Sequence, residues 1–295
     1  MHAAALRIVD PLPSRRRLFL DSLRGMRKPQ PSSTPALPGD VLVRPAVELD
    51  ATSIKAYAQV CGFRPEQGVP LTFPHVLAFP LHMLLLTAPR FPYSAVGMVH
   101  LANRIRQHYR LEIGQAMRIE VRCDRWMAHA KGQALVIAAS AKSGGELVWE
   151  SESVYLSRGA KTPSGDSYED DTEIDPKRLL PIQRWQLGGD LGRRYASVSG
   201  DHNPIHTSLL GARLFGFRRA IAHGMWSKAR ALAGVLPSRP LTAAQVAVSF
   251  KTPAFLPSAA LLQVDNQEHA KLFAVHSATG ARPHLYGRLQ GVSTL

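Results

Sequence analysis

The sequence predicts an α+β protein built from two similar halves, each an antiparallel sheet wrapped around a central helix. Its 295 residues exceed the commonest size of a single domain, so two domains or one doubled unit are expected. Each half contains the same elements in the same order: a helix, a loop, a long apolar helix and four strand-like segments. One long helix followed by consecutive strands favours a sheet that packs around that helix.

Residues 1–39 are predicted to form a basic arm, with a short amphipathic helix around Arg15–Met26 and a proline- and serine-rich tether over 29–38. The arm lacks the apolar core and the small-residue cleavage site of a secretory signal. Its basic, acid-poor composition is compatible with a mitochondrial presequence, but its prolines disfavour a long amphipathic helix. We therefore expect a cytoplasmic protein.

The N-terminal half is expected over residues 40–158. Asp50 can cap a helix that ends at Cys61-Gly62. An apolar helix is expected over 75–87, where Pro80 marks either a kink or a start. Turn signals then separate four predicted strands, at 95–105, 116–126, 133–140 and 147–156.

Residues 159–180 are polar and locally acidic without an apolar period, and we expect a linker there. The C-terminal half is expected over 181–295. Its predicted helices lie at 187–198 and 222–236, and its predicted strands at 243–251, 259–267, 272–277 and 283–292. The two halves share element order only, because their sequence identity is too low for an alignment.

The longest apolar stretch, residues 76–86, is interrupted by Pro80 and His82 and is too short to span a bilayer, so no membrane span is expected. Cys61 and Cys123 lie far apart, without clustered histidine partners. They support neither a disulfide framework nor a metal site, and no cofactor is expected.

The net charge of +14 is compatible with three interpretations. Nucleic acid is one, but the basic residues are scattered and no nucleic-acid recognition motif accompanies them, so we expect no nucleic acid. Coenzyme A, or the acidic surface of an acyl carrier protein, is another. A basic, solvated surface without a dedicated partner fits the charge equally well.

The loop from Ser199 to His206 carries the residue types of an active site. Asp201 and His206 lie five residues apart across Asn203-Pro204, a dipeptide that favours a turn and keeps the loop off helical geometry. Such a turn can bring a carboxylate and an imidazole to one water molecule, with Asn203 and Ser199 placed to orient them. Reversible hydration of an activated double bond needs these two groups. An ordinary loop is the more frequent meaning of such a turn when it stands alone.

Gly224 lies near the start of the apolar helix expected over 222–236, directly after His223. Its backbone N–H has no side chain in the way, and the helix dipole adds positive potential there. This position would suit the oxygen of a thioester carbonyl that becomes enolate-like in the transition state.

The segments 195–206, 216–217 and 222–225 together closely resemble the MaoC-like, (R)-specific enoyl-CoA hydratase and 3-hydroxyacyl-thioester dehydratase family. The resemblance is strong over 183–292 and weaker over 41–158. It implies a double hot-dog fold and the reversible hydration of trans-2-enoyl thioesters of coenzyme A or acyl carrier protein. It also implies that Asp201 and His206 form the catalytic pair, that Ser199 and Asn203 support them, and that Gly224 donates to the thioester oxygen. The family loop often has an aspartate two residues after the histidine, where this chain has Ser208.

The N-terminal half lacks this loop and has Cys61-Gly62-Phe63-Arg64-Pro65 in its place. Phe79, Met83, Leu84 and Leu85 on its helix are interpreted first as core residues. The alternative, by resemblance to double hot-dog enzymes, is that this half holds a long acyl chain by apolar burial.

Two hypotheses from different classes follow for the whole chain. The first is a hydro-lyase of fatty-acyl metabolism. The second is a non-catalytic acyl-thioester binding module or a subunit that stabilises a partner enzyme, which the intact set of Asp201, Asn203 and His206 disfavours. Several points stay open. They are the length of the acyl chain, the choice between coenzyme A and acyl carrier protein, the direction of the reaction, which of Asp201 and His206 is the base, and whether the protein is a monomer or a homodimer.

Overall fold

The computed structural model describes residues 5–24, 28, 31–33, 35–170, 172, 174–267 and 269–294. The chain folds into two compact units and passes between them several times. The first unit comprises Met1–Glu48, Pro74–Asn103 and Ala116–Glu169, and the second comprises Leu49–Phe73, Arg104–Gln115 and Asp170–Leu295. The helix α2, Ala51–Cys61, therefore belongs to the second unit although it lies early in the sequence. As predicted, Asp50 caps its start and Gly62, in the left-handed conformation, ends it.

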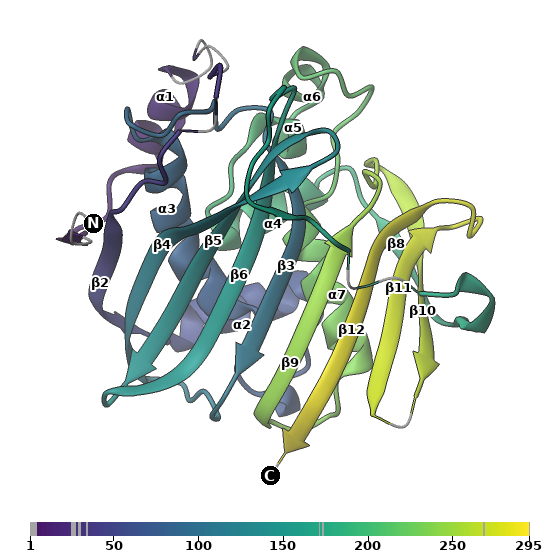
Figure 1. Cartoon of the computed structure of the whole chain (residues 1–295). Helices are drawn as coiled ribbons and strands as arrows, with labels where there is room; N and C mark the ends of the chain where they lie inside the picture. The colour runs from purple at the N-terminus through teal and green to yellow at the C-terminus, as the bar shows by residue number, and fades with distance from the viewer. Residues whose placement is uncertain are drawn as a thin grey trace. The chain divides into compact units, whose positions relative to one another are not determined.

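The first unit is an antiparallel sheet in the order β2-β4-β5-β6-β3 (Figure 1). The strands are β2 (Val41–Glu48), β3 (Val99–Gln107, with Val99–Asn103 in this unit), β4 (Ala116–His129), β5 (Gly132–Ser143) and β6 (Glu146–Arg158). Its central helix is α3, Phe73–Thr87, which continues through Pro80. His82 of α3 packs on Tyr155 of β6, with ring centroids 6.2 Å apart. Of the four helix residues expected in the core, Leu85 is buried and the other three are half-buried.

The second unit repeats this order with β8-β10-β11-β12-β9. The strands are β8 (Leu180–Leu187), β9 (Leu241–Phe250), β10 (Ser258–Asn266), β11 (Ala270–Ser277) and β12 (Pro283–Thr294). The central helix α7, Gly224–Val235, lies against these strands and buries Ala229 and Leu232 completely (Figure 1). Three shorter helices precede it: α4 (Leu191–Ser199), α5 (Pro204–Thr207) and α6 (Leu209–Leu214).

The repeat predicted from element order is confirmed and is one strand longer than expected. In each half of the sequence an additional strand precedes these elements and pairs with the second of the four later strands, as β2 does with β4 and β8 with β10. The expected helix over 187–198 begins only at Leu191, because Leu187 closes β8. Pro181 obscures β8 in the sequence, and the strand tolerates it because an edge strand leaves one row of N–H groups unpaired.

The arm packs on the first unit through β1 (Leu6–Ile8), which pairs in parallel with β2. The expected amphipathic helix is α1, Arg15–Arg24; its predicted end at Met26 lies outside the described residues. Farther along, the Lys28 ammonium donates to the carbonyl oxygens of Ala88, at 2.8 Å, and Phe91, at 2.6 Å.

The expected linker contains two short pieces of structure. Strand β7, Asp166–Ser167, pairs with β4, and Ile174 and Leu179 pack on β11. Both cysteines are buried free thiols. Among the described residues, no helix is long and apolar enough to cross a membrane.

Candidate active site

The polar loop of the second unit begins where α4 ends. Gly200 takes the left-handed conformation, with φ of 76°, and turns the chain away from the helix. The buried Ser199 hydroxyl accepts a hydrogen bond from the Asp201 N–H at 3.2 Å. Asp201 Oδ1 accepts in turn from the Asn203 N–H at 3.1 Å. The loop therefore starts from a fixed point on α4.

The expectation that Asn203-Pro204 prevents helical geometry in the loop was wrong. Asn203 is the N-cap of the single-turn helix α5, and its side-chain oxygen accepts from the Ile205 N–H at 3.3 Å. Pro204 fits the first helical position because an N–H there would have no partner within the helix. The short helix carries His206, five residues after Asp201.

Two contacts fix His206. Its Nδ1 lies 2.8 Å from the carbonyl oxygen of Ile221. On the other side, α4 approaches so closely that a Cβ on Gly192 would lie 1.8 Å from the His206 carbonyl oxygen. Gly192 is therefore required by this packing.

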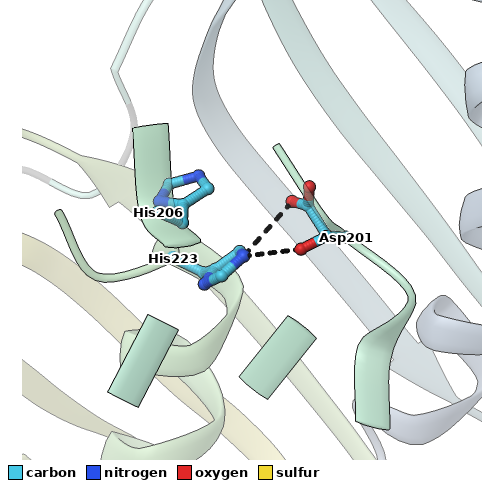
Figure 2. Close-up of side chains that lie close together, drawn as sticks. All are labelled: Asp201, His206 and His223. Carbon is cyan, nitrogen blue, oxygen red and sulfur yellow. Dashed lines mark hydrogen bonds and ion pairs between the residues drawn. The ribbon is translucent and has the colours of Figure 1, made fainter. Parts of the chain in front are cut away.

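His223 joins Asp201 and His206, and the sequence reasoning had not assigned it a role. Figure 2 shows it between them: its Nε2 lies 3.0 Å from the Asp201 carbonyl oxygen and 3.8 Å from Asp201 Oδ2. Its ring stacks on that of His206, with centroids 3.8 Å apart and planes inclined by 25°. The ring of Tyr195, which is also buried, contacts the His223 ring with 4.8 Å between the centroids. The only signal in the sequence was its place before Gly224.

The hydrogen bonds define the tautomer of each imidazole. A carbonyl oxygen only accepts, so His206 carries its proton on Nδ1 and His223 carries its proton on Nε2. The lone pair of His206 is therefore on Nε2. His223 Nδ1 is buried without a hydrogen-bond partner in the described part of the chain.

Burial keeps both imidazoles neutral near pH 7. Desolvation lowers the pKa of His206, although the charge of Asp201 and the Ile221 carbonyl oppose this shift. For His223, desolvation and the neighbouring His206 lower the pKa to about 3. A neutral imidazole with a free lone pair can accept a proton, so His206 is suited to act as a base.

Gly224 begins α7 directly after His223. Its amide has no partner within the helix because it belongs to the first turn. A Cβ at this position would lie 2.9 Å from the ring of Phe250 on β9, so packing as well as access requires glycine. The N–H of Gly224 is therefore a backbone donor at the start of α7. It directly follows His223, whose ring stacks on that of His206.

Of the predicted residues, the structure brings Asp201 and His206 together, with His223 as the third member. Their candidate ligand atoms all lie within 4.8 Å of one another. Ser199 and Asn203 use their side-chain oxygens to hold the loop backbone, which is a supporting position.

Comparisons with known proteins identify the family of this chain. A model of the MaoC-like domain matches residues 175–281. The 3-hydroxyacyl-thioester dehydratase X of Mycobacterium tuberculosis is 32% identical over 259 residues, which cover 88% of this chain and 92% of the relative. The chain belongs to the MaoC-like dehydratase family.

Solved structures of MaoC-like proteins share the fold. The crystal structure of HtdX from Mycobacterium tuberculosis has a TM-score of 0.73 and 30% identity, covering 85% of this chain and 99% of that one. A MaoC-like dehydratase from Phytophthora capsici has a TM-score of 0.72 at 15% identity, covering 86% and 94%. A Mycobacterium tuberculosis protein described as a double hotdog has a TM-score of 0.56 at 13% identity, covering 85% and 94%. The predicted double hot-dog fold is confirmed.

In this MaoC-like protein, Ser208 replaces the aspartate that often follows the loop histidine. Ser208 is the N-cap of α6, and its hydroxyl accepts from the Gly211 N–H at 2.9 Å. An aspartate could cap the same helix. Ser208 therefore has a structural role at the start of α6.

Asp201, His206 and His223 are also the residue types of a metal site. Their arrangement fits a metal poorly, because an imidazole binds a metal with the lone pair in its ring plane and these two rings are nearly parallel, 3.8 Å apart. In addition, His223 Nε2 and His206 Nδ1 already donate to carbonyl oxygens. A metal bound by both His206 Nε2 and His223 Nδ1 would require at least one of the stacked rings to turn.

Proposed function

We propose that this chain catalyses the reversible interconversion of trans-2-enoyl thioesters and (R)-3-hydroxyacyl thioesters. The observation that carries the proposal is the pairing of the Asp201 carboxylate with a neutral His206 whose Nε2 lone pair is free. The Gly224 amide follows directly after His223, which stacks on His206. The relative in Mycobacterium tuberculosis is named a 3-hydroxyacyl-thioester dehydratase. The substrate would be a thioester of coenzyme A or of acyl carrier protein.

His206 is the proposed base and Asp201 the group that orients the water. In hydration, His206 Nε2 takes a proton from water while the water oxygen bonds to Cβ of the enoyl group. The electron pair of the double bond moves toward the thioester oxygen, which the Gly224 amide and the α7 dipole stabilise. His206 then returns its proton to Cα, so the H and OH that are added come from one water molecule. Dehydration reverses these steps.

Within the first unit, Phe79, Met83 and Leu84 of α3 are half-buried, so they keep apolar area that an apolar ligand could cover. A series of enoyl-CoA substrates with acyl groups of different length tests both the reaction and the acyl length that the protein accepts. We expect purified protein to consume crotonyl-CoA or a longer enoyl-CoA, seen as loss of the absorbance of the conjugated thioester, and to form the (R)-alcohol.

The rival function is a non-catalytic acyl-thioester binding module. It predicts binding of acyl-CoA at some chain length without turnover at any. That result with a folded protein would contradict the proposed reaction.

We also propose a cytoplasmic location with the arm retained. Support comes from the contacts of the arm, since β1 pairs with β2 and Lys28 is bonded to the carbonyl oxygens that follow α3. A removable import sequence would not need these contacts.

A further inference from the structure

The helix α6 exposes an apolar face in the second unit. Leu209, Leu210 and Leu214 keep 48%, 71% and 76% of their surface exposed. Positions 209, 210, 213 and 214 lie on one side of the helix, whereas Gly211 and Ala212 on the other side are buried. Three exposed leucines on one short helix are unusual, because monomeric surfaces seldom gather apolar side chains without a partner.

Three arginines lie on this helix or shortly after it in the sequence. Arg213 lies on the same face of α6, and Arg218 and Arg219 follow the helix. Both of the latter guanidinium groups lie over the ring of Phe255, at 4.7 and 5.6 Å from its centroid, and Arg219 also donates to the Pro257 carbonyl oxygen at 3.0 Å. Together with the three leucines, these arginines are called the α6 surface below.

No carboxylate neutralises the α6 surface within the described part of the chain. None of its arginines forms an ion pair there. The sequence itself has no aspartate or glutamate between Asp201 and Asp265. Two guanidinium groups on one aromatic ring repel each other, so the surface would be stabilised by an anionic partner.

The α6 surface is attached rigidly to the catalytic turn. His206 lies on α5, and α6 begins three residues later, with the Ser208 cap between them. The two helices lie side by side (Figure 1) and touch so closely that a Cβ on Gly211 would lie 2.5 Å from Pro204 Cβ. A partner bound here is therefore held next to the loop that would receive its thioester.

We infer that the α6 surface docks an acyl carrier protein, through an exposed helix that carries both carboxylates and apolar side chains. The inference rests on the proposed function, since the carrier would present the acyl thioester on its phosphopantetheine arm. Carboxylates would pair with the arginines while apolar side chains cover the leucines, the pattern of a protein interface with an apolar centre and a charged rim.

Two other occupants fit this surface less well. The nucleotide of coenzyme A has phosphates for the arginines, but its single base is too small to cover three leucines spread along a helix. A second copy of this chain in a twofold dimer would place the same cationic patch against itself. The combined chemistry therefore favours an acidic protein.

The test compares one 3-hydroxyacyl chain presented on an acyl carrier protein and on coenzyme A. We expect the double variant Arg213→Glu/Arg218→Glu to lower the ratio of kcat/KM for the carrier-linked to the CoA-linked substrate at least tenfold. Leu210→Ser/Leu214→Ser should lower the ratio in the same direction. Arg184→Glu, on the exposed face of β8, is a control that reverses one charge instead of two and should leave the ratio unchanged.

The outcomes separate the docking surface from the reaction. The docking inference is wrong if the α6 variants have the unfolding midpoint of the wild type and leave the ratio unchanged. It is also wrong if they lower kcat/KM equally for both substrates. If wild-type protein turns over neither substrate, the proposed function fails instead. A carrier variant with basic residues on its recognition helix should restore the ratio in the Arg213→Glu/Arg218→Glu protein, which loss of stability would not allow.

Discussion

At the scale of single residues, the candidate site depends on which nitrogen of each histidine carries a proton. The Ile221 carbonyl fixes the His206 proton on Nδ1, and the Asp201 carbonyl fixes the His223 proton on Nε2. The sequence was sufficient to predict that Asp201 and His206 lie close together, because Asn203-Pro204 between them favours a turn. It was insufficient for His223, because the bond from that ring crosses 22 residues and forms only when α7 packs beside the loop.

We predict that His223 positions Asp201. His223→Phe keeps an aromatic ring on His206 but removes the donor to the Asp201 carbonyl, which leaves the loop held only by its own bonds. Loss of one such bond, about 1–3 kcal/mol, should lower kcat by roughly 10- to 100-fold with a smaller change in KM. Steady-state kinetics on an enoyl-CoA would measure this. A kcat equal to that of the wild type would show that the bond does not position the carboxylate.

At the scale of elements, close helix packing sets the position of the site. Helix α4 contacts the backbone of His206 through Gly192, and α7 presents Gly224 beside Phe250. Sequence patterns predicted α4, α7 and eight of the strands. They did not predict β8, where Pro181 broke the strand pattern, or the single turn of α5, where a cap and a proline start a helix too short to show a period.

Gly192→Ala tests this packing. The new Cβ would clash with the His206 carbonyl, so α4 or α5 must shift, and overpacking of this kind costs about 1–3 kcal/mol. We expect a lower unfolding midpoint in denaturant and a reduced kcat. Gly189→Ala is the control, because its Cβ would meet only Pro257 Cδ at an ordinary 3.9 Å. Equal behaviour of the two variants would argue against a close contact between α4 and His206.

At the scale of the whole molecule, the two units share one strand order that sequence identity did not reveal. Element order alone predicted the repeat. The assignment of α2 to the second unit was not predictable, because it depends on contacts that join distant segments: Trp226 Nε1 donates to the Val60 carbonyl oxygen at 3.0 Å, and Gln67 donates to carbonyl oxygens at the end of α7. Such contacts leave no local pattern in the sequence.

Each unit also holds a deeply buried histidine, which makes the fold sensitive to acid. Burial lowers the pKa of both His82 and His223 to about 3, against a value near 6.5 in the unfolded chain. Between these values the unfolded state binds more protons, so stability falls as the pH drops below about 6.5. The loss approaches about 1.4 kcal/mol per pH unit for each histidine.

Denaturant unfolding at pH 7, 6, 5 and 4 measures this loss, and His82→Phe should reduce its slope. A slope that is the same in the variant and the wild type would mean that His82 is not held neutral in the folded protein.

The central claim is that Asp201 and His206 together add one water molecule to an enoyl thioester. The most direct test is the kcat/KM of Asp201→Asn and His206→Ala for hydration of an enoyl-CoA that the wild type accepts, with unfolding midpoints measured alongside. We predict that each variant loses at least two orders of magnitude in kcat/KM while its unfolding midpoint stays close to that of the wild type. Full activity in both folded variants would contradict the claim.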